Sequence, residues 1–155
     1  MPPAPDPTTA KPPIRTPRSV AGQLTIALSK STYSTSELNP SSGGVRATLG
    51  NTADQTFYSM IGDAFNGAAE QNPLYVANGS DASLERQQGS DWVVVTGVQM
   101  VEGVKIVSIR PGKSYDLIVQ SSAATAGNYR IVVAYRNTAT GSASLRSVSP
   151  TFEVR

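Results

Sequence analysis

The sequence predicts an all-β fold, an antiparallel β-sandwich of about seven to nine short strands. Its 155 residues are 39% hydrophobic and only 15% charged, and Ser, Thr, Gly and Val are frequent, a balance that favours strands joined by polar turns. Short runs of alternating apolar residues recur along the chain, separated by Gly, Pro and Asn. Runs of this length predict packed sheets rather than helices.

The clearest strand signal is the stretch 127–135, which we expect at the centre of the sandwich. Its alternate residues from Tyr129 to Tyr135 are apolar and share one face. The spacing of Gly127 and Tyr129 is that of a tyrosine corner, in which the phenol hydroxyl hydrogen-bonds to backbone just upstream. Gly127 and Tyr129 are therefore assigned structural roles.

The first 22 residues differ in composition from the rest, and we divide the chain into an extended Pro-rich arm or linker, 1–22, and a sandwich domain, 23–155. The arm holds seven of the eleven prolines, which exclude helix and favour polyproline II. Such a segment is either a disordered linker or an arm held by a protein partner. For the second case we expect four contact residues: Pro12, Pro13, Arg15 and Arg18.

The formal net charge of +2 belongs to the arm, because the remaining residues carry ten basic and ten acidic side chains. The body shows no basic cluster of the kind that binds phosphates, so we expect no nucleic-acid partner. The longest apolar runs are strand-sized, which predicts no transmembrane segment and leaves membrane contact to a partner. The N-terminus also lacks the apolar core of a signal peptide. Either an export signal was removed, or the protein is made and used without one.

The body begins with a strand at 23–29, followed by a loop rich in Ser, Pro and Gly and a second strand at 45–49. After an Asn-Thr-Ala-Asp turn, a third strand runs through Phe57, Tyr58 and Met60. We expect these three strands to form a β-meander on one side of the sandwich.

Residues 61–82 are less regular, with a short helical turn expected within 63–70 and further turns after it. An insertion of this length between strands is a natural place for a binding loop. Phe65 and Tyr75 are the contact candidates in it, although large apolar groups of this kind more often cap the core.

The second half predicts a hairpin over 84–95 with a four- or five-residue connection, and then strands at 104–109, 115–120 and 147–154. Pro111 and Gly112 form a strong turn, because proline presets φ at the first central position and glycine supplies positive φ at the second. Both are assigned structural roles, as is Trp92 in the hairpin.

Two missing residue types exclude several chemistries. The chain has no Cys, so disulfides, thiolate metal sites and cysteine nucleophiles are excluded, and no His, the commonest general base. Lys30 and Lys113 each neighbour a serine, but neighbours on a strand point to opposite faces. The acidic residues show no spacing typical of a calcium loop or a glycosidase pair. We therefore expect no enzyme and no cofactor.

The order of these pieces resembles that of bacterial immunoglobulin-like domains of exported proteins and lipoproteins and, more distantly, of immunoglobulin-like proteinase inhibitors of the BsuPI type. The resemblance covers nearly all of 23–155. The pieces that carry it are 51–54, 84–86, Trp92, 109–115, 127–130 and 152–154. The cysteines of antibody-type domains are absent, and Ile131 stands where the second would fall. The resemblance implies an immunoglobulin-like fold and an extracytoplasmic location, in the periplasm or at the cell surface.

These observations predict a non-catalytic structural or interaction module, an accessory subunit that docks onto a larger bacterial protein assembly through its arm and its sandwich surface. Two alternatives stay open. One is a proteinase inhibitor whose loop at 63–78 enters an active-site cleft. The other is a virion decoration or capsid-associated protein, which would place the chain in the virion.

Overall fold

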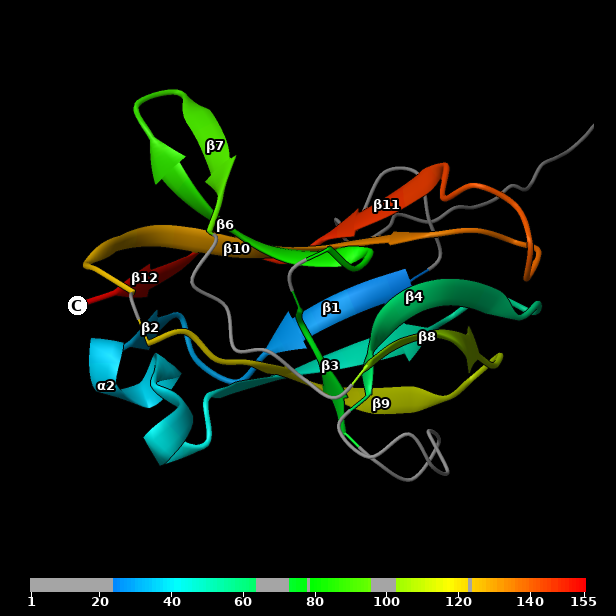
Figure 1. Ribbon diagram of the computed structural model, residues 1–155, viewed down its shortest axis with the longest axis horizontal. Helices are drawn as coiled ribbons and strands as arrows, with labels where there is room; N and C mark the ends of the chain where they lie inside the picture. The colour runs from blue at the N-terminus through cyan, green and yellow to red at the C-terminus, as the bar shows by residue number, and fades with distance from the viewer. Residues whose placement is uncertain (1–23, 64–72, 78, 96–102, 123) are drawn as a thin grey trace, which may run out of the picture.

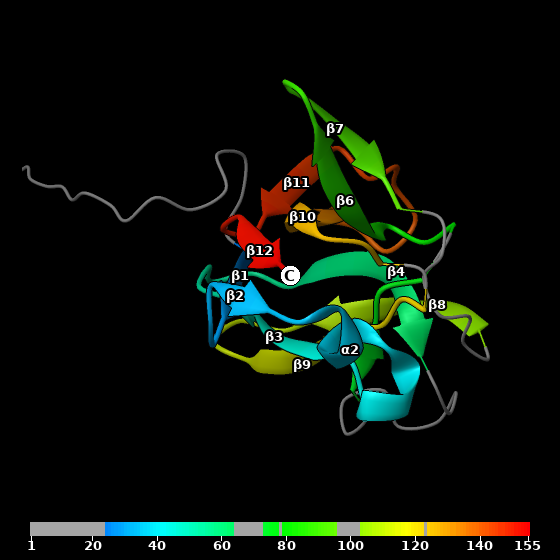
Figure 2. The same ribbon diagram turned by 90° about the vertical axis from the view of Figure 1, so that its left-hand side faces the viewer.

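The computed structural model describes residues 24–63, 73–77, 79–95, 103–122 and 124–155. Within them the fold is mainly β, and two six-stranded sheets pack face to face as a sandwich (Figures 1 and 2). The predicted β-sandwich is confirmed. The arm at 1–22, with its four predicted contact residues, lies outside the described residues, as does Phe65.

The strands of the first sheet follow one another in an order far from that of the sequence. The order is β1 (Leu24–Leu28), β3 (Val45–Asn51), β9 (Ser114–Val119), β5 (Leu74–Tyr75), β4 (Phe57–Asp63) and β8 (Gly103–Ile109). The expected meander of the first three predicted strands is wrong, because β9 and β5 lie between β3 and β4.

The second sheet contains the predicted central strand, β10. Its order is β2 (Thr32–Tyr33), β12 (Phe152–Val154), β10 (Gly127–Tyr135), β6 (Ala82–Gln88) and β7 (Asp91–Val94), and β11 (Leu145–Val148) also pairs with β10. The single final strand expected at 147–154 is divided in two, because Ser149, Pro150 and Thr151 interrupt the pairing.

Both sheets are mixed rather than antiparallel, and the described residues form twelve strands instead of the seven to nine predicted. The parallel pairs are β12 with β2 and β5 with β9. β2 and β5 have only two residues each, too few to show a period of two in the sequence. Their pairing comes from neighbours that are distant along the chain.

A short helical segment stands in the loop that the sequence left without structure. It consists of α2 (Thr35–Leu38) and the 3-10 turn η1 (Pro40–Ser42). Ser34 caps α2 in a capping box, in which its hydroxyl accepts from the Glu37 backbone NH while the Glu37 carboxylate accepts from the Ser34 NH. Leu38, which is fully buried, anchors this segment to the core.

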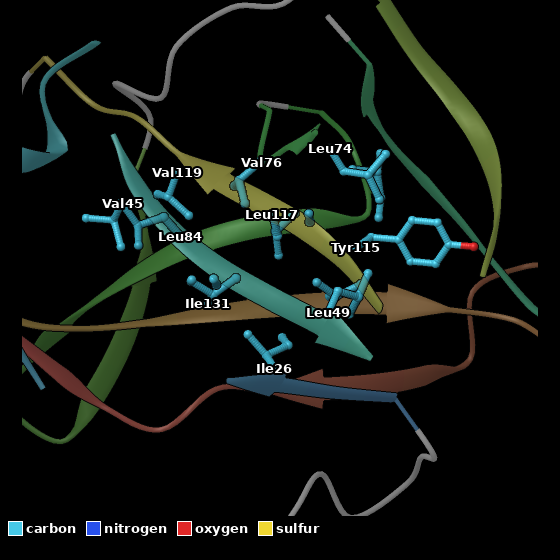
Figure 3. Close-up of a cluster of buried hydrophobic side chains, with 14 of the residues drawn as sticks. Ile26, Val45, Leu49, Leu74, Val76, Leu84, Tyr115, Leu117, Val119 and Ile131 are labelled. Carbon is cyan, nitrogen blue, oxygen red and sulfur yellow. The ribbon is translucent and has the colours of Figure 1, made fainter. Parts of the chain in front are cut away.

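The core lies between the two sheets and is built by alternation along each strand. Figure 3 shows side chains of the first sheet, among them Ile26, Leu49 and Leu117, facing Leu84 and Ile131 of the second. In β10 the four alternate residues from Tyr129 to Tyr135 are buried, as the sequence pattern predicted.

Two predicted turns have the expected hydrogen bonds, and one connection is shorter than predicted. The Tyr129 hydroxyl donates to the Thr125 carbonyl at 2.7 Å, which is the bond of a tyrosine corner. Gly112 has a φ of 72°, and the Lys113 NH donates to the Arg110 carbonyl at 3.2 Å, which closes the Pro-Gly turn. The β6–β7 hairpin pairs Gln88 directly with Asp91, so its connection has two residues rather than four or five.

Candidate interaction surface

Exposed large hydrophobic side chains gather on three strands of the described structure. They are Met60, Val93, Val94, Val104 and Ile106, on β4, β7 and β8. β7 and β8 are the terminal strands of their sheets. At the opposite side of the sandwich, the buried Ser147 hydroxyl of β11 donates to the Leu24 carbonyl of β1 at 2.8 Å, which links the two sheets. Within the described residues, a hydrogen bond thus links the two sheets at the β1–β11 side, and exposed apolar side chains lie on the terminal strands β7 and β8.

The outer face of β4 and β8 carries a continuous apolar surface, which we call the β4–β8 patch and define as Tyr58, Met60, Val104 and Ile106. Met60 lies directly opposite Ile106 in the antiparallel register, and these side chains are 37% and 36% exposed. Opposite residues of an antiparallel pair have side chains on the same face, close enough for contact. The row of Met60 and Ile106 is thus the centre of the patch.

Alternation explains why these side chains point outward. The intervening residues of β4, namely Phe57, Ser59 and Ile61, are buried against the core, and so are Val107 and Ile109 of β8. A strand with one buried face must present its other residues to the opposite side of the sheet.

The backbone beneath the patch is held firmly by Asp81. Its carboxylate accepts from the Met60 NH at 2.8 Å, and its own NH donates to the Met60 carbonyl at 2.7 Å. The Arg136 guanidinium donates to the same carboxylate oxygen, and both side chains are largely buried. A buried ion pair with further hydrogen bonds fixes local geometry.

A second link joins β4 to the other sheet. Tyr58 and Arg136 exchange two backbone hydrogen bonds of 2.8 and 2.9 Å, and the Ser59 hydroxyl donates to the Ala134 carbonyl at 2.7 Å. β4 is therefore tied to the end of β10, and the patch rests on a preorganised strand.

Tyr75, a predicted contact residue, lies on the same outer face as the patch. It is half-buried in β5, opposite Gly62 of β4 on one side and Ile118 of β9 on the other. Gly62 in turn lies opposite Val104. The row therefore leads from Tyr75 across the buried Gly62 to Val104.

Trp92, a predicted structural residue, is outside the core, on the outer face of the second sheet. The Arg130 guanidinium carbon lies 4.3 Å from the centroid of the Trp92 ring. The Arg130 Nε donates to the Glu85 carboxylate at 2.7 Å. Arg146 approaches the other Glu85 oxygen at 3.9 Å. Trp92 thus supports the hairpin through a cation–π contact at the surface.

Lys30, one of the two lysines that neighbour a serine, is engaged in an ion pair. The Lys30 ammonium lies 2.7 Å from the Glu37 carboxylate, over the Tyr33 ring. That hydrogen bond, with those from Ser34, lowers the pKa of Glu37 below its usual value of 4.5. Asp81 and Glu85 are bound by arginines.

Among the described residues there is no candidate for a metal site or for a membrane-spanning helix. No three acidic side chains come together there in a way that would hold a metal ion. None of the helices in that part of the chain is long and apolar enough to cross a membrane.

The sequence reasoning did not find Asn51 or the β4–β8 patch. The Asn51 side chain is buried; its Nδ2 donates to the Gln55 and Ile109 carbonyls, both at 2.8 Å, and its Oδ1 accepts from the Ala53 NH. The predicted Asn-Thr-Ala-Asp turn was the sequence feature that could have pointed to a structural role of Asn51. For the patch, Val104 and Ile106 alternate with Lys105 and Val107. Both faces of this strand therefore contain apolar residues, and the sequence did not show which face was buried.

These features define the chain as a two-sheet β-sandwich protein. No family model, curated protein or solved structure matches the chain. The likeness to immunoglobulin-like domains therefore rests on the sequence pattern alone.

Proposed function

We propose that this chain is a non-catalytic, immunoglobulin-like interaction module, an accessory subunit that docks onto a larger bacterial protein assembly outside the cytoplasm. The observation that carries the proposal is the row of exposed apolar side chains on the outer face of β4 and β8, where Met60 lies opposite Ile106 and Val104 is the next outward residue of β8. Apolar side chains that cluster on one side of a soluble domain are typical of protein contact surfaces. The rigid support of β4 by Asp81 favours the same role, because preorganised surfaces lose little entropy on binding.

The patch alone gives modest affinity. Met60, Val104 and Ile106 are each exposed by 36–37%, so burying the remainder of each side chain contributes about 0.5–1 kcal/mol. Their sum, about 2 kcal/mol, is well below the roughly 8 kcal/mol of a micromolar complex. The module therefore needs a larger footprint than the patch.

The Pro-rich arm is our candidate for the rest of the footprint. Its Pro12 and Pro13 favour a stiff polyproline II conformation, which costs little entropy to bind, and Arg15 and Arg18 add charged contacts. Two linked contacts raise each other's effective concentration, so the arm and the patch reinforce one another.

Fewer observations support the two alternative functions. An inhibitor would present the loop at 63–78, but Leu74 and Tyr75 in that stretch form a strand inside the first sheet. Only residues 64–72 would then be left to enter a cleft. A virion protein would use the same patch and arm, and identification of the partner separates that alternative from the first proposal.

The test is native purification from the source, with identification of the proteins that co-elute. We expect co-elution with one defined partner, binding roughly 10- to 30-fold weaker in the double variant Met60→Ser, Ile106→Ser, and weaker also when residues 1–22 are removed. Thr48→Ser, on the exposed outer face of β3, is the matched control and should bind as the wild type does. A monomer without partners in every form would reject the proposal.

A further inference from the structure

Met60 presents a thioether to solvent at the centre of the β4–β8 patch. Its side chain is 37% exposed and lies directly opposite Ile106 in the register of β4 and β8. The chain contains three methionines and no cysteine, and Met1 and Met100 lie outside the described residues. Oxidants reach a methionine sulfur where solvent reaches it. Met60 is therefore a candidate for oxidation in the folded protein.

The surroundings of Met60 indicate that oxidation would change the surface and not the fold. The Met60 NH donates to the Asp81 carboxylate at 2.8 Å, and the Met60 carbonyl accepts from the Asp81 NH at 2.7 Å, so the backbone is held independently of the side chain. The neighbours Ser59 and Ile61 are fully buried and anchor β4 on its other face. A sulfoxide in a core disrupts packing, whereas water solvates its oxygen on an outer face.

We propose that Met60 is a redox-modification site, at which a peroxide converts the centre of the β4–β8 patch from apolar to polar while the sandwich stays folded. The sulfur lone pair attacks one oxygen of hydrogen peroxide, the O–O bond breaks and an S–O bond forms. The sulfur loses two electrons, and the other peroxide oxygen leaves as water. Methionine sulfoxide reductases return the sulfoxide to the thioether, so the change is reversible.

The inference deepens the proposed function, and its regulatory consequence rests on that function. A partner that packs on Met60 and Ile106 would have to remove water from the sulfoxide oxygen. Burying a polar group without a hydrogen-bond partner is unfavourable, so oxidation would release the partner and reduction would restore binding. The modification itself needs no partner and is tested separately.

Peptide mapping of the full chain in dilute hydrogen peroxide measures the modification. Trypsin cleaves after Arg46 and Arg86, and the peptide 47–86 has Met60 as its one methionine. We expect Met60 of the folded protein to form the sulfoxide at a rate within about threefold of that in the isolated peptide. Retention of the protein on a phenyl column should fall after oxidation, and the midpoint of thermal unfolding should change by no more than about 2 °C.

Met60→Leu is the matched control, because leucine keeps the side chain apolar and forms no sulfoxide. It retains Met1 and Met100, so their oxidation contributes equally to both proteins. We expect no fall in retention for peroxide-treated Met60→Leu. In the wild type, methionine sulfoxide reductases should restore the original retention. A slower rate of sulfoxide formation, unfolding on oxidation, or a retention that changes equally in both proteins would overturn the proposal.

Capture of the partner from the source extract separates this proposal from the proposed function. We expect oxidised wild type to bind the co-eluting partner about tenfold more weakly than untreated protein, and peroxide-treated Met60→Leu to bind as before. Equal binding of oxidised and untreated wild type would overturn the regulatory role and leave the proposed function standing. Sulfoxide formation at Met60 without a partner for any form would reject the proposed function and leave the modification site standing.

Discussion

The Asn51 side chain joins several segments at its end of the first sheet. It bonds to the carbonyls of Gln55 and Ile109 and to the Ala53 NH, so one amide serves a turn and a distant strand. Its own backbone NH and carbonyl bond to Lys113 and Gly112 of the Pro-Gly turn. A small polar side chain can replace backbone partners in this way where strands end.

Replacing Asn51 by Ala should lower the free energy of unfolding by about 2–4 kcal/mol, because the buried Ile109 carbonyl and other backbone groups lose their partner. The measurement is urea unfolding followed by circular dichroism. The matched control is Asn128→Ala, which removes an exposed side chain with one hydrogen bond of 3.3 Å to Gln87 and should cost about 0.5 kcal/mol or less. Equal effects of the two substitutions would contradict the role assigned to Asn51.

Among the elements, α2 shows how a segment with four residues is stabilised by its cap. Ser34 and Glu37 form the capping box, and Lys30 reaches the same carboxylate from the preceding loop. Four residues are too few for helix propensity to hold the element. Its stability therefore depends on this cap and on the buried Leu38.

The lowered pKa of Glu37 gives a dependence of stability on pH. Its carboxylate stabilises the folded state above the unfolded pKa of 4.5, and this contribution is lost as pH falls through the lower folded pKa. Glu37→Gln keeps an N3 amide that can complete the capping box and removes the charge. We expect the variant to be less stable than the wild type at pH 7 and the difference to shrink below pH 4.5. A difference that stays constant across denaturant unfolding at pH 7 and pH 3 would contradict this account.

The strands differ in how far the sequence determined them. β1, β3, β4 and β10 have five or more residues with alternating burial, and each was predicted near its observed position. β2 and β5 were missed, because two residues carry no periodicity and their parallel partners, β12 and β9, are remote in sequence. Local pattern specifies a strand but not its neighbours.

At the scale of the molecule, the sandwich is asymmetric. The Ser147–Leu24 hydrogen bond links the sheets at one side, whereas the described terminal strands at the other side, β7 and β8, carry exposed apolar side chains. The sequence could not predict this surface, because both faces of β8 carry apolar residues and the pattern did not show which of them packs on the core. The sequence pattern did give Tyr75 as a contact candidate, and it lies in the row that leads to Val104.

Site-specific photo-crosslinking tests the contact surface most directly. A photoreactive amino acid at position 106, on the β4–β8 patch, is compared with the same group at position 48, on the outer face of β3, both in the source extract. We expect one discrete adduct from position 106, which disappears when Met60→Ser is added, and no such adduct from position 48. Equal crosslinking from both positions, or an adduct from position 48 alone, would contradict the assignment of the β4–β8 patch as the surface that binds the partner.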